Sequence, residues 1–281
     1  MKKTLTYSAW KKAAKFYKNI IKVPHRPSVG ELRIYEDYIK KLVKEGKKTA
    51  LVLGATPGIR DILAKYNFEA TLLDVNFDMI KAMGSLVRRK KRSEKIVIGN
   101  WIKMPFKENS FDIALGDHSY SNIDFKKWDK LSKEIIRVLK PDGYHIHNMN
   151  IALPEKLSFE GLIKKYRQNP ELFRDYKNKV LYQYQVYTSD PRIYNRKIFK
   201  SDWEKYDNIL AKFYRVGKIS KKELKILGNP LSTKGFKFYL PPKKIVDKLF
   251  KKYFRIIKVK HNKAHPVFKR YQIYLMKNKD G

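Results

Sequence analysis

The stretch Thr49-Ala-Leu-Val-Leu-Gly-Ala-Thr-Pro-Gly-Ile-Arg-Asp61 decides how the main fold of this chain begins. A short apolar run ends at Gly54, and Pro57 stands where a helix can start, because a first helical residue needs no bonded N–H. A second apolar run, Ala70-Thr-Leu-Leu-Asp74, ends in a carboxylate 20 residues after Gly54. This is the layout of a βαβ nucleotide site, in which glycine admits the ligand and the acid accepts hydrogen bonds from ribose hydroxyls.

Strand-like and helix-like segments alternate on both sides of this stretch. We expect strands at 49–53, 70–74, 95–99, 111–116 and 144–149, helices at 57–65, 77–84 and 125–139, and a closing helix at 242–253 before strands at 254–260 and 270–276. Strands that alternate with helices form a parallel, doubly wound sheet. The predicted fold class is therefore α/β, a seven-stranded sheet that is mostly parallel with an antiparallel edge hairpin.

Two further regions flank this sheet. Residues 7–22 and 30–44 have helical spacing, with a helix cap expected at Ser28. Residues 155–235 are aromatic-rich, basic and helical in pattern, with no clear strand. We therefore divide the chain into N-terminal helices that cover the nucleotide site (1–45), one domain formed by 46–154 and 236–281, and a helical insertion at 155–235 that serves as a substrate lid.

The composition excludes several classes of protein. No apolar run is long enough for a membrane span, and the first residues lack the apolar core of a signal peptide, so we expect a cytoplasmic protein with no membrane partner. The chain has no cysteine, which excludes disulfides, zinc–thiolate sites and cysteine nucleophiles.

The formal charge of +37 favours an anionic partner such as nucleic acid. However, the 64 basic residues comprise 50 lysines and only 14 arginines, and the lysines are spread along the whole chain. Proteins that read phosphates and bases favour arginine, whose planar fork matches those groups. The charge therefore leaves RNA open as a partner without identifying it, and the sequence does not assign an oligomeric state.

Four motifs, taken in order, resemble those of class I S-adenosylmethionine (SAM)-dependent methyltransferases. They are Leu51–Gly58, Leu73–Met79, Gly99–Phe106 together with Asn109–Asp117, and Glu134–Gly143. The resemblance covers about 45–150 and 240–277, and the loop at Gly54 is similar to that of a subfamily with Leu-Gly-Ala-Thr-Pro. It implies a Rossmann-like sheet, SAM as cofactor, and methyl transfer as the activity.

The resemblance also implies a set of cofactor-binding residues. Gly54, Ala55 and Thr56 would contact the methionine part, Asp74 and its neighbour Val75 the ribose, Met79, Asn100 and Trp101 the adenine, and Gly116 and Asp117 the region near the methyl group. Asn100 stands where the family usually has an acid, but its amide oxygen can still accept the adenine N–H.

Two departures from the family pattern concern the methionine part of the cofactor. Val52 and Thr56 stand where an acid and a second glycine are usual. Asp117 is one candidate for holding the amino group. Arg26 is a candidate for the carboxylate, because an arginine fork suits that group, although Arg26 also fits the description of a surface residue between two helices.

His118 is the candidate general base, because it follows the fourth strand and an imidazole titrates near working pH. The alternative is a loop histidine without a role. His145 and His147 alternate along the fifth strand and point to one face. A metal cluster with Asp117 and His118 is conceivable, but a hydrogen-bonded polar strand end is favoured, and we expect no metal.

The sequence limits the methyl acceptor. Without cysteine, C5 methylation of pyrimidines through a thiolate adduct is excluded. The segment Gly116-Asp-His-Ser-Tyr120 also lacks the Asn/Asp-Pro-Pro-aromatic turn that grips exocyclic base amines. We therefore expect transfer to oxygen or nitrogen of a small molecule. The walls of the acceptor pocket would come from Tyr120, Tyr144 and aromatic residues of the insertion: Tyr182, Tyr184, Tyr187, Trp203 and Tyr206. In the alternative, the insertion aromatics form only the core of the lid.

Three other functions remain open. One is methylation of RNA or another polyanion through the basic surface, and another is a non-catalytic module that binds the cofactor or a partner. The third is a nicotinamide-dependent short-chain dehydrogenase, suggested by the glycine turn and by Tyr214-Arg-Val-Gly-Lys218. That Tyr-x-x-x-Lys spacing arises easily in a chain with 19 tyrosines and 50 lysines, and the edge hairpin has no place in such an enzyme.

Overall fold

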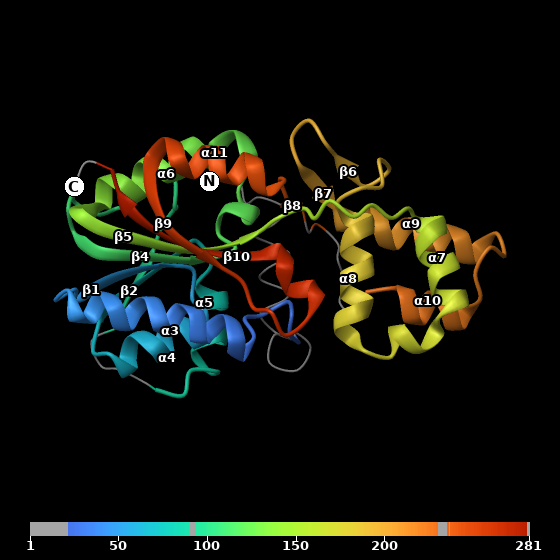
Figure 1. The fold of residues 1–281 in the computed structure, drawn as a ribbon, viewed down its shortest axis with the longest axis horizontal. Coiled ribbons are helices and arrows are strands. Elements are labelled where there is room, and N and C mark those ends of the chain that lie inside the picture. The colour runs from blue at the N-terminus through green and yellow to red at the C-terminus, as the bar shows by residue number, and fades with distance from the viewer. Residues whose placement is uncertain (1–21, 90–93, 230–234, 236, 280–281) are drawn as a thin grey trace.

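A seven-stranded sheet between two helical layers forms the main body of the computed structural model, and a helical insertion lies beside it (Figure 1). The structure describes residues 22–89, 94–229, 235 and 237–279. The helix predicted for 7–22 lies outside the described residues. Among the residues that are described, no helix is both long and apolar enough to cross a membrane.

The order of the strands in the sheet is β3-β2-β1-β4-β5-β10-β9, with the first five parallel and β10 antiparallel to both of its neighbours. The strands are β1 (Thr49–Leu53), β2 (Glu69–Asp74), β3 (Lys95–Ile98), β4 (Phe111–Asp117), β5 (Leu139–Asn150), β9 (Phe254–Lys260) and β10 (Tyr271–Asn278). The helices beside them are α3 (Val29–Lys44), α4 (Pro57–Lys65), α5 (Phe77–Gly84), α6 (Trp128–Val138) and α11 (Lys243–Tyr253). Short 3-10 helices are η1 (Tyr120–Asn122), η2 (Phe125–Lys127) and η4 (Pro266–Arg270). The predicted Rossmann-like fold class is confirmed.

Local sequence signals fix where the helices start. Ser28 caps α3 and forms a reciprocal capping box with Glu31, and Pro57 is the first residue of α4. Asn76 caps α5 by accepting a hydrogen bond from the backbone of Met79. Most boundaries differ from the prediction by one to three residues, and the largest difference is at β5. This strand begins at Leu139, directly after α6, because Leu139 pairs with Phe111 before the register shifts.

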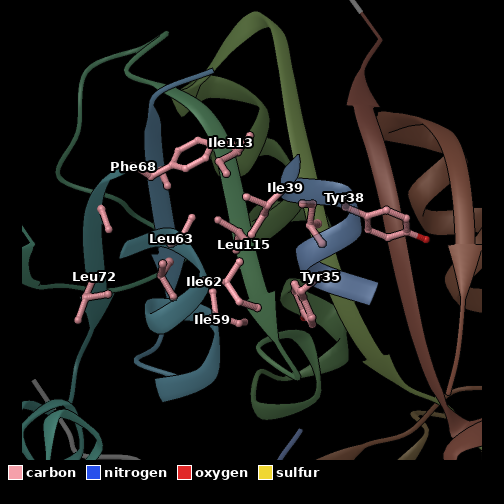
Figure 2. Packing of buried hydrophobic residues seen from close by; sticks show 14 of the residues in the cluster. Tyr35, Tyr38, Ile39, Ile59, Ile62, Leu63, Phe68, Leu72, Ile113 and Leu115 are labelled. Atoms are coloured by element: carbon pink, nitrogen blue, oxygen red, sulfur yellow. The ribbon is translucent and has the colours of Figure 1, made fainter. Parts of the chain in front are cut away.

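Alternate residues of the central strands enter two separate cores. Ala50 and Val52 pack under α3, α4 and α5, where Tyr35, Ile39 and Leu63 are fully buried (Figure 2). The other face is covered by α6 and α11 and includes the buried residues Leu51, Leu53, Trp128, Leu131, Val246 and Phe250. Both faces of the sheet are therefore closed, and ligands can approach only at its ends.

The insertion has a core of its own and a small sheet that we did not predict. It contains α7 (Phe159–Gln168), η3 (Pro170–Phe173), α8 (Tyr176–Tyr187), β6 (Tyr194–Asn195), β7 (Lys200–Asp202), α9 (Trp203–Arg215), α10 (Lys221–Leu227) and β8 (Lys237–Tyr239). The expectation of no strand in 155–235 is wrong, because β6 and β7 pair there. These strands are two and three residues long and too polar to show an apolar alternation. Since β8 pairs with β7, the small sheet crosses the boundary predicted at residue 235.

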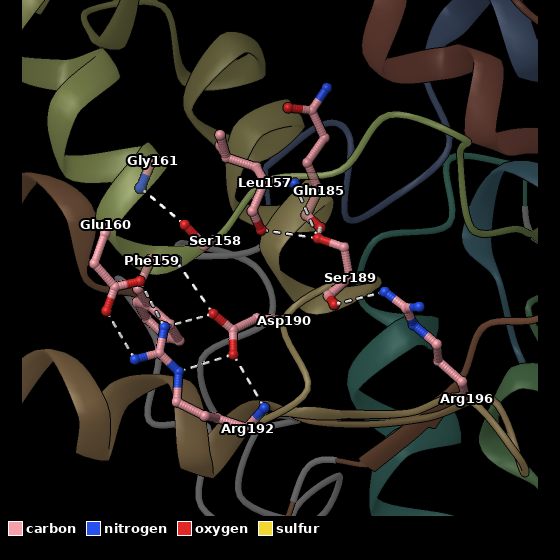
Figure 3. Close-up of polar contacts among 10 residues, drawn as sticks. All are labelled: Leu157, Ser158, Phe159, Glu160, Gly161, Gln185, Ser189, Asp190, Arg192 and Arg196. Atoms are coloured by element: carbon pink, nitrogen blue, oxygen red, sulfur yellow. Dashed lines mark hydrogen bonds and ion pairs between the residues drawn. The ribbon is translucent and has the colours of Figure 1, made fainter.

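An ion-pair network connects the start of α7 to the segment that follows α8, and only its Asp190 is buried (Figure 3). The guanidinium of Arg192 bonds both Asp190 and Glu160, and Asp190 also accepts the backbone N–H of Phe159. The insertion core further includes Val267, Phe268 and Tyr271, which lead into β10. The insertion is therefore packed against the edge of the sheet at which β10 begins.

Candidate functional site

The carboxyl ends of β1, β2, β4 and β5 bring polar residues to one edge of the sheet. Gly54 follows β1, Asp74 ends β2, Asp117 ends β4, and Asn148 and Asn150 end β5. Parallel strands all end at the same edge, which is where doubly wound folds bind ligands.

Gly54 lies between Asp74 and Trp101. Its φ of +105° is a conformation that L side chains rarely adopt. A Cβ on Gly54 would lie 3.8 Å from Oδ2 of Asp74 and 3.9 Å from the Trp101 ring. Trp101 is itself held by a 2.6 Å hydrogen bond from its indole N–H to the carbonyl of Leu73. The missing side chain therefore leaves a gap between a carboxylate and a flat aromatic ring.

Asp74 is a partly buried carboxylate with acceptor capacity to spare. Its Oδ1 accepts the backbone N–H of Asn76 at 2.9 Å. Burial raises the pKa of Asp74 to about 6, so the group is mainly ionised at neutral pH. A carboxylate has about four lone-pair sites, and those that remain suit a pair of hydroxyl donors.

A second group of acids lies at the end of β4. The side-chain amide of Asn148 donates to Oδ1 of Asp117 at 3.1 Å and to Oε1 of Glu31 at 3.2 Å. The Thr56 hydroxyl donates to Oδ2 of Asp117 at 3.4 Å. Burial raises the pKa of Asp117 to about 7 and also raises the pKa of Glu31. Two buried carboxyls that share one amide favour binding of a cationic group.

His118 follows Asp117 directly and is held in a left-handed backbone conformation, with a φ of +60°. Its backbone N–H donates to the carbonyl of Asn148 at 3.0 Å, and Asn122 donates to its carbonyl. Its Nε2 lies 3.4 Å from Oδ1 of Asp117, and its ring centroid lies 5.1 Å from that of Tyr271.

The imidazole of His118 is held in its neutral form. Burial lowers the pKa of His118 to about 4, so the ring is neutral at pH 7. Its Nδ1 is buried and has no hydrogen-bond partner among the described residues. In the tautomer that carries its proton on Nε2, this N–H points to Asp117, and Nδ1 keeps a lone pair that can accept a proton.

The other predicted cofactor residues differ in how far they are buried. Ala55 and Met79 are buried in the core beneath α3, α4 and α5, and Val75 is half-buried beside Asp74. Asn100 is exposed, and its side-chain oxygen accepts the backbone N–H of Ile102 within its own turn. Arg26 is exposed to solvent.

Gly116 has a packing role. A Cβ at this position would collide with the ring of His147 and come within 2.9 Å of the Ser119 hydroxyl. Its carbonyl accepts a 2.8 Å hydrogen bond from Tyr35. The absence of a side chain at Gly116 is thus explained by His147, and any contact with a ligand would come from the backbone.

His145 and His147 point to one face of the sheet, as predicted. This face is covered by α6 and α11, so both rings are buried in the core. Their rings lie 5.2 Å apart, and His147 packs against Tyr120 at 4.9 Å while His145 packs against Phe254 at 5.4 Å. Among the described residues, no group of three His, Asp or Glu side chains is arranged to hold a metal ion.

The proposed walls of the acceptor pocket need two corrections. Tyr120 is fully buried, and its hydroxyl pairs with Ser132 on α6. Tyr144 lies within β5, which begins at Leu139, and not at the carboxyl end of the strand. Its hydroxyl donates to the carboxylate of Glu45. Of the insertion aromatics, Tyr184, Tyr187, Trp203 and Tyr206 are buried in the insertion core. Tyr184 also contacts the guanidinium of Arg270, at the sheet edge.

Four residues near this edge were not foreseen: Glu31, Asn148, Arg270 and Tyr271. Glu31 has the sequence signature of a helix cap, which explains it fully without a site. Asn148 could have been noticed, because a buried strand that ends in amides needs partners for them. Arg270 and Tyr271 approach only through the antiparallel pairing of β10 with β5, which no local pattern reveals.

Residues 52–147 match the model of a family described as "Methyltransferase domain". The matched segment contains Gly54, Asp74, Asp117 and His118, together with β2, β3 and β4 and parts of β1 and β5. These residues form a SAM-dependent methyltransferase domain on a class I sheet, and SAM is its cofactor. The Tyr-x-x-x-Lys motif of the dehydrogenase alternative falls in the insertion, where Tyr214 is 41% exposed on α9.

Solved structures share the fold at low sequence identity. The CcbJ methyltransferase of Streptomyces caelestis has a TM-score of 0.61 at 10% identity, covering 99% of both chains. The N-methyltransferase NodS of Bradyrhizobium japonicum, in complex with S-adenosylhomocysteine, has a TM-score of 0.56 at 9% identity and covers 98% of both chains. A Rhodobacter sphaeroides protein described as a zinc-dependent alcohol dehydrogenase has a TM-score of 0.62 at 14% identity, covering 99% of this chain and 100% of its own. At these identities the likeness concerns the fold alone.

Among curated proteins, the chain is 26% identical over 198 residues to the uncharacterized protein MJ0638 of Methanocaldococcus jannaschii. The alignment covers 65% of this chain and 81% of that protein.

The residues at the sheet edge fit SAM. Without a side chain, Gly54 leaves its backbone open between Asp74 and Trp101, and the acceptor sites that Asn76 does not use on Asp74 suit two ribose hydroxyls. The carboxyls of Asp117 and Glu31 match a group that carries a positive charge.

Proposed function

We propose that this methyltransferase acts on an oxygen or nitrogen atom of a small molecule that is held against His118. The observation that carries the proposal is the buried Nδ1 of His118, which has no partner among the described residues although it lies at the end of β4. A buried polar atom without a partner is costly and therefore points to a bound group. The insertion (155–235) would cover this acceptor, and residues 1–45 would cover the cofactor.

In this proposal the two groups at the sheet edge divide the binding of SAM between them. Asp74 accepts the ribose hydroxyls, Gly54 and Trp101 bound the nucleoside, and Asp117 holds the amino group of the methionine part. The bound cofactor supplies an electrophilic methyl group on its sulfonium. The protein then needs mainly to align the acceptor with that methyl group.

His118 acts as the general base. Its neutral ring takes the proton from the acceptor's O–H or N–H onto Nδ1 as the acceptor gains the methyl group. Asp117 lies 3.4 Å from Nε2, where it orients the ring and stabilises the positive charge that the ring acquires. The left-handed backbone of His118 fixes the side chain at the end of the strand.

The experiment that tests this function follows methyl transfer from labelled SAM into pools of small metabolites and, separately, into RNA. We expect calorimetry to show that SAM binds, and the label to enter a small-molecule fraction. Label that enters only RNA would overturn the choice of acceptor. If SAM binds and neither pool is labelled, the proposed catalytic role of the site is wrong.

A polyanion acceptor is the second candidate, and one surface feature favours it. A groove of about 430 Å³ on the insertion is lined by Lys205, Lys212 and Arg215 of α9 together with Arg192. If RNA is the acceptor, its affinity should fall steeply with salt, and charge reversal at Lys205 and Lys212 should reduce the slope. The small-molecule proposal expects that charge reversal to leave methyl transfer unchanged.

The affinity for SAM should depend on pH through Asp117. Its pKa of about 7 means that half of the molecules lose this carboxylate at neutral pH, and a bound ammonium favours the ionised form. The dissociation constant should therefore rise about tenfold per pH unit as the pH falls below 7. Calorimetry between pH 5 and 9 measures this.

The variant Asp117→Asn is the control for that pH series. It should bind SAM more weakly at pH 8, and its affinity should fall only below about pH 6, where Asp74 takes up a proton. An unchanged pH profile in Asp117→Asn would show that another group holds the amino nitrogen.

A further inference from the structure

Arg270 is a buried cation without an acid to neutralise it. Lys47, Arg60 and Arg270 are the buried basic residues of the described segments. Lys47 pairs with Asp142, and Arg60 pairs with Glu94 at 2.6 Å, but no described carboxylate lies within ion-pair distance of Arg270. The segments outside the description contain a single acidic side chain, that of Asp280. Burying a charge without a counter-charge is destabilising, so such a residue calls for an explanation other than the fold.

The contacts of Arg270 with the described residues hold its guanidinium in place and use two of its five N–H donors. Its Nε and Nη2 both donate to the side-chain oxygen of Asn150, at 2.8 and 2.6 Å. The guanidinium carbon lies 2.9 Å from the centroid of the Tyr184 ring. A guanidinium carries five N–H donors in a fixed plane, and Asn150 accepts two of them. The group is therefore oriented by an amide and an aromatic face, neither of which balances its charge.

Arg270 lies beside the proposed base. It is the last residue of η4, and the next residue, Tyr271, pairs with Asn150 at the carboxyl end of β5. The Tyr271 ring centroid lies 5.1 Å from the His118 ring and 5.4 Å from the Arg270 guanidinium. One aromatic ring thus contacts both groups. The charge of Arg270 also contributes to the lowered pKa of His118.

Aromatic rings from the insertion complete this region. The ring of His25 lies 6.0 Å from that of Tyr184 and 6.1 Å from that of Trp203. Such surroundings favour a flat, apolar molecule, because aromatic rings pack against one another by stacking and by edge-to-face contact.

We propose that Arg270 binds a carboxylate of the methyl acceptor, and that the acceptor is a small aromatic acid. Its carboxylate lies against the N–H groups of Arg270 that Asn150 does not accept, its ring packs beside Tyr271 and Tyr184, and its nucleophilic oxygen or nitrogen faces His118. The planar fork of arginine matches a carboxylate in geometry and charge. This inference rests on the proposed function, since it names the acceptor class for the same site.

Arg60 and Arg270 should differ in how much they contribute to the stability of the fold. Removing an ion-paired buried arginine leaves its acid unpaired, whereas removing Arg270 relieves an uncompensated charge. Arg60→Met should therefore lower the melting temperature clearly more than Arg270→Met, although the two substitutions are identical in chemistry. A larger loss in Arg270→Met would mean that Arg270 serves the fold, which would contradict its assignment as a ligand site.

Calorimetric titration of the full chain, saturated with S-adenosylhomocysteine, tests the site directly. Benzoate is the probe, and benzamide is its uncharged counterpart of the same shape. We expect benzoate to bind at least tenfold more tightly than benzamide, and Arg270→Met to abolish that preference. The affinity for S-adenosylhomocysteine should stay the same in Arg270→Met, and Arg60→Met should keep the benzoate preference.

The titrations distinguish a failure of the Arg270 assignment from a failure of the proposed function. If S-adenosylhomocysteine does not bind the unaltered chain, the proposed function fails. If it binds while benzoate and benzamide bind equally, only the assignment of Arg270 fails. Should Arg270→Met not fold, the unaltered chain still decides, because a crystal soaked in benzoate shows the carboxylate either on Arg270 or elsewhere.

Discussion

Replacing His118 with glycine should lower kcat by about 10²–10⁴, the range that a positioned general base contributes. Glycine is the appropriate substitution, because the backbone at this position has a φ of +60° and an alanine would be strained there. The affinity for SAM should remain within twofold, since the proposed cofactor ligands are Asp74 and Asp117. The measurement is the rate at which S-adenosylhomocysteine forms, at saturating SAM and acceptor.

Two controls separate a base from a structural histidine in this experiment. Added imidazole should restore part of the rate in His118→Gly, because the variant leaves room for the missing ring, and should not stimulate the unaltered enzyme. The acid limb of kcat/KM near pH 4, which reports protonation of His118, should disappear in the variant. A rate that stays within threefold in His118→Gly would remove His118 from the mechanism.

The fold could be predicted because each element carries its own signal. Apolar runs define the central strands, and Ser28, Pro57 and Asn76 define where helices begin. The small sheet of the insertion escaped prediction because β6 and β7 are too short to show a period. Its strands are held by pairing across the chain and by the packing around Trp203, and neither is visible locally.

The proposed cofactor half of the site, at Gly54 and Asp74, was also easier to predict from the sequence than the proposed acceptor half, at His118 and Arg270. Gly54 and Asp74 end consecutive strands of one βαβ unit, so their meeting follows from the order of the chain. His118 and Arg270 both lie beside the ring of Tyr271 because β10 returns antiparallel beside β5. A histidine after a strand can be noticed in a sequence, but a buried arginine without an acid becomes visible only when its neighbours are known. Sequence motifs therefore predict the proposed cofactor half of the site, whereas the proposed acceptor half emerges only from the structure.

Replacing Asp74 with alanine should weaken SAM binding about a hundredfold. Hydrogen bonds to an ionised group contribute about 1.5–3 kcal/mol, and each 1.4 kcal/mol changes a dissociation constant tenfold. Asp74→Asn should lose less, because its amide oxygen can still accept one hydroxyl. Calorimetry at pH 8 is the measurement, since the carboxylate, with a pKa of about 6, is fully ionised there.

A neighbouring acid provides the matched control for Asp74→Ala. Asp78 lies in the first turn of α5, exposed and four residues further along the chain, so Asp78→Ala changes the net charge equally. SAM should bind Asp78→Ala as it binds the unaltered chain, because an exposed charge is screened by solvent and salt. Equal losses in both variants would show that only the overall charge matters. If Asp74→Ala keeps its affinity within twofold, the ribose hydroxyls are held by other residues, and the gap at Gly54 is not the nucleoside site.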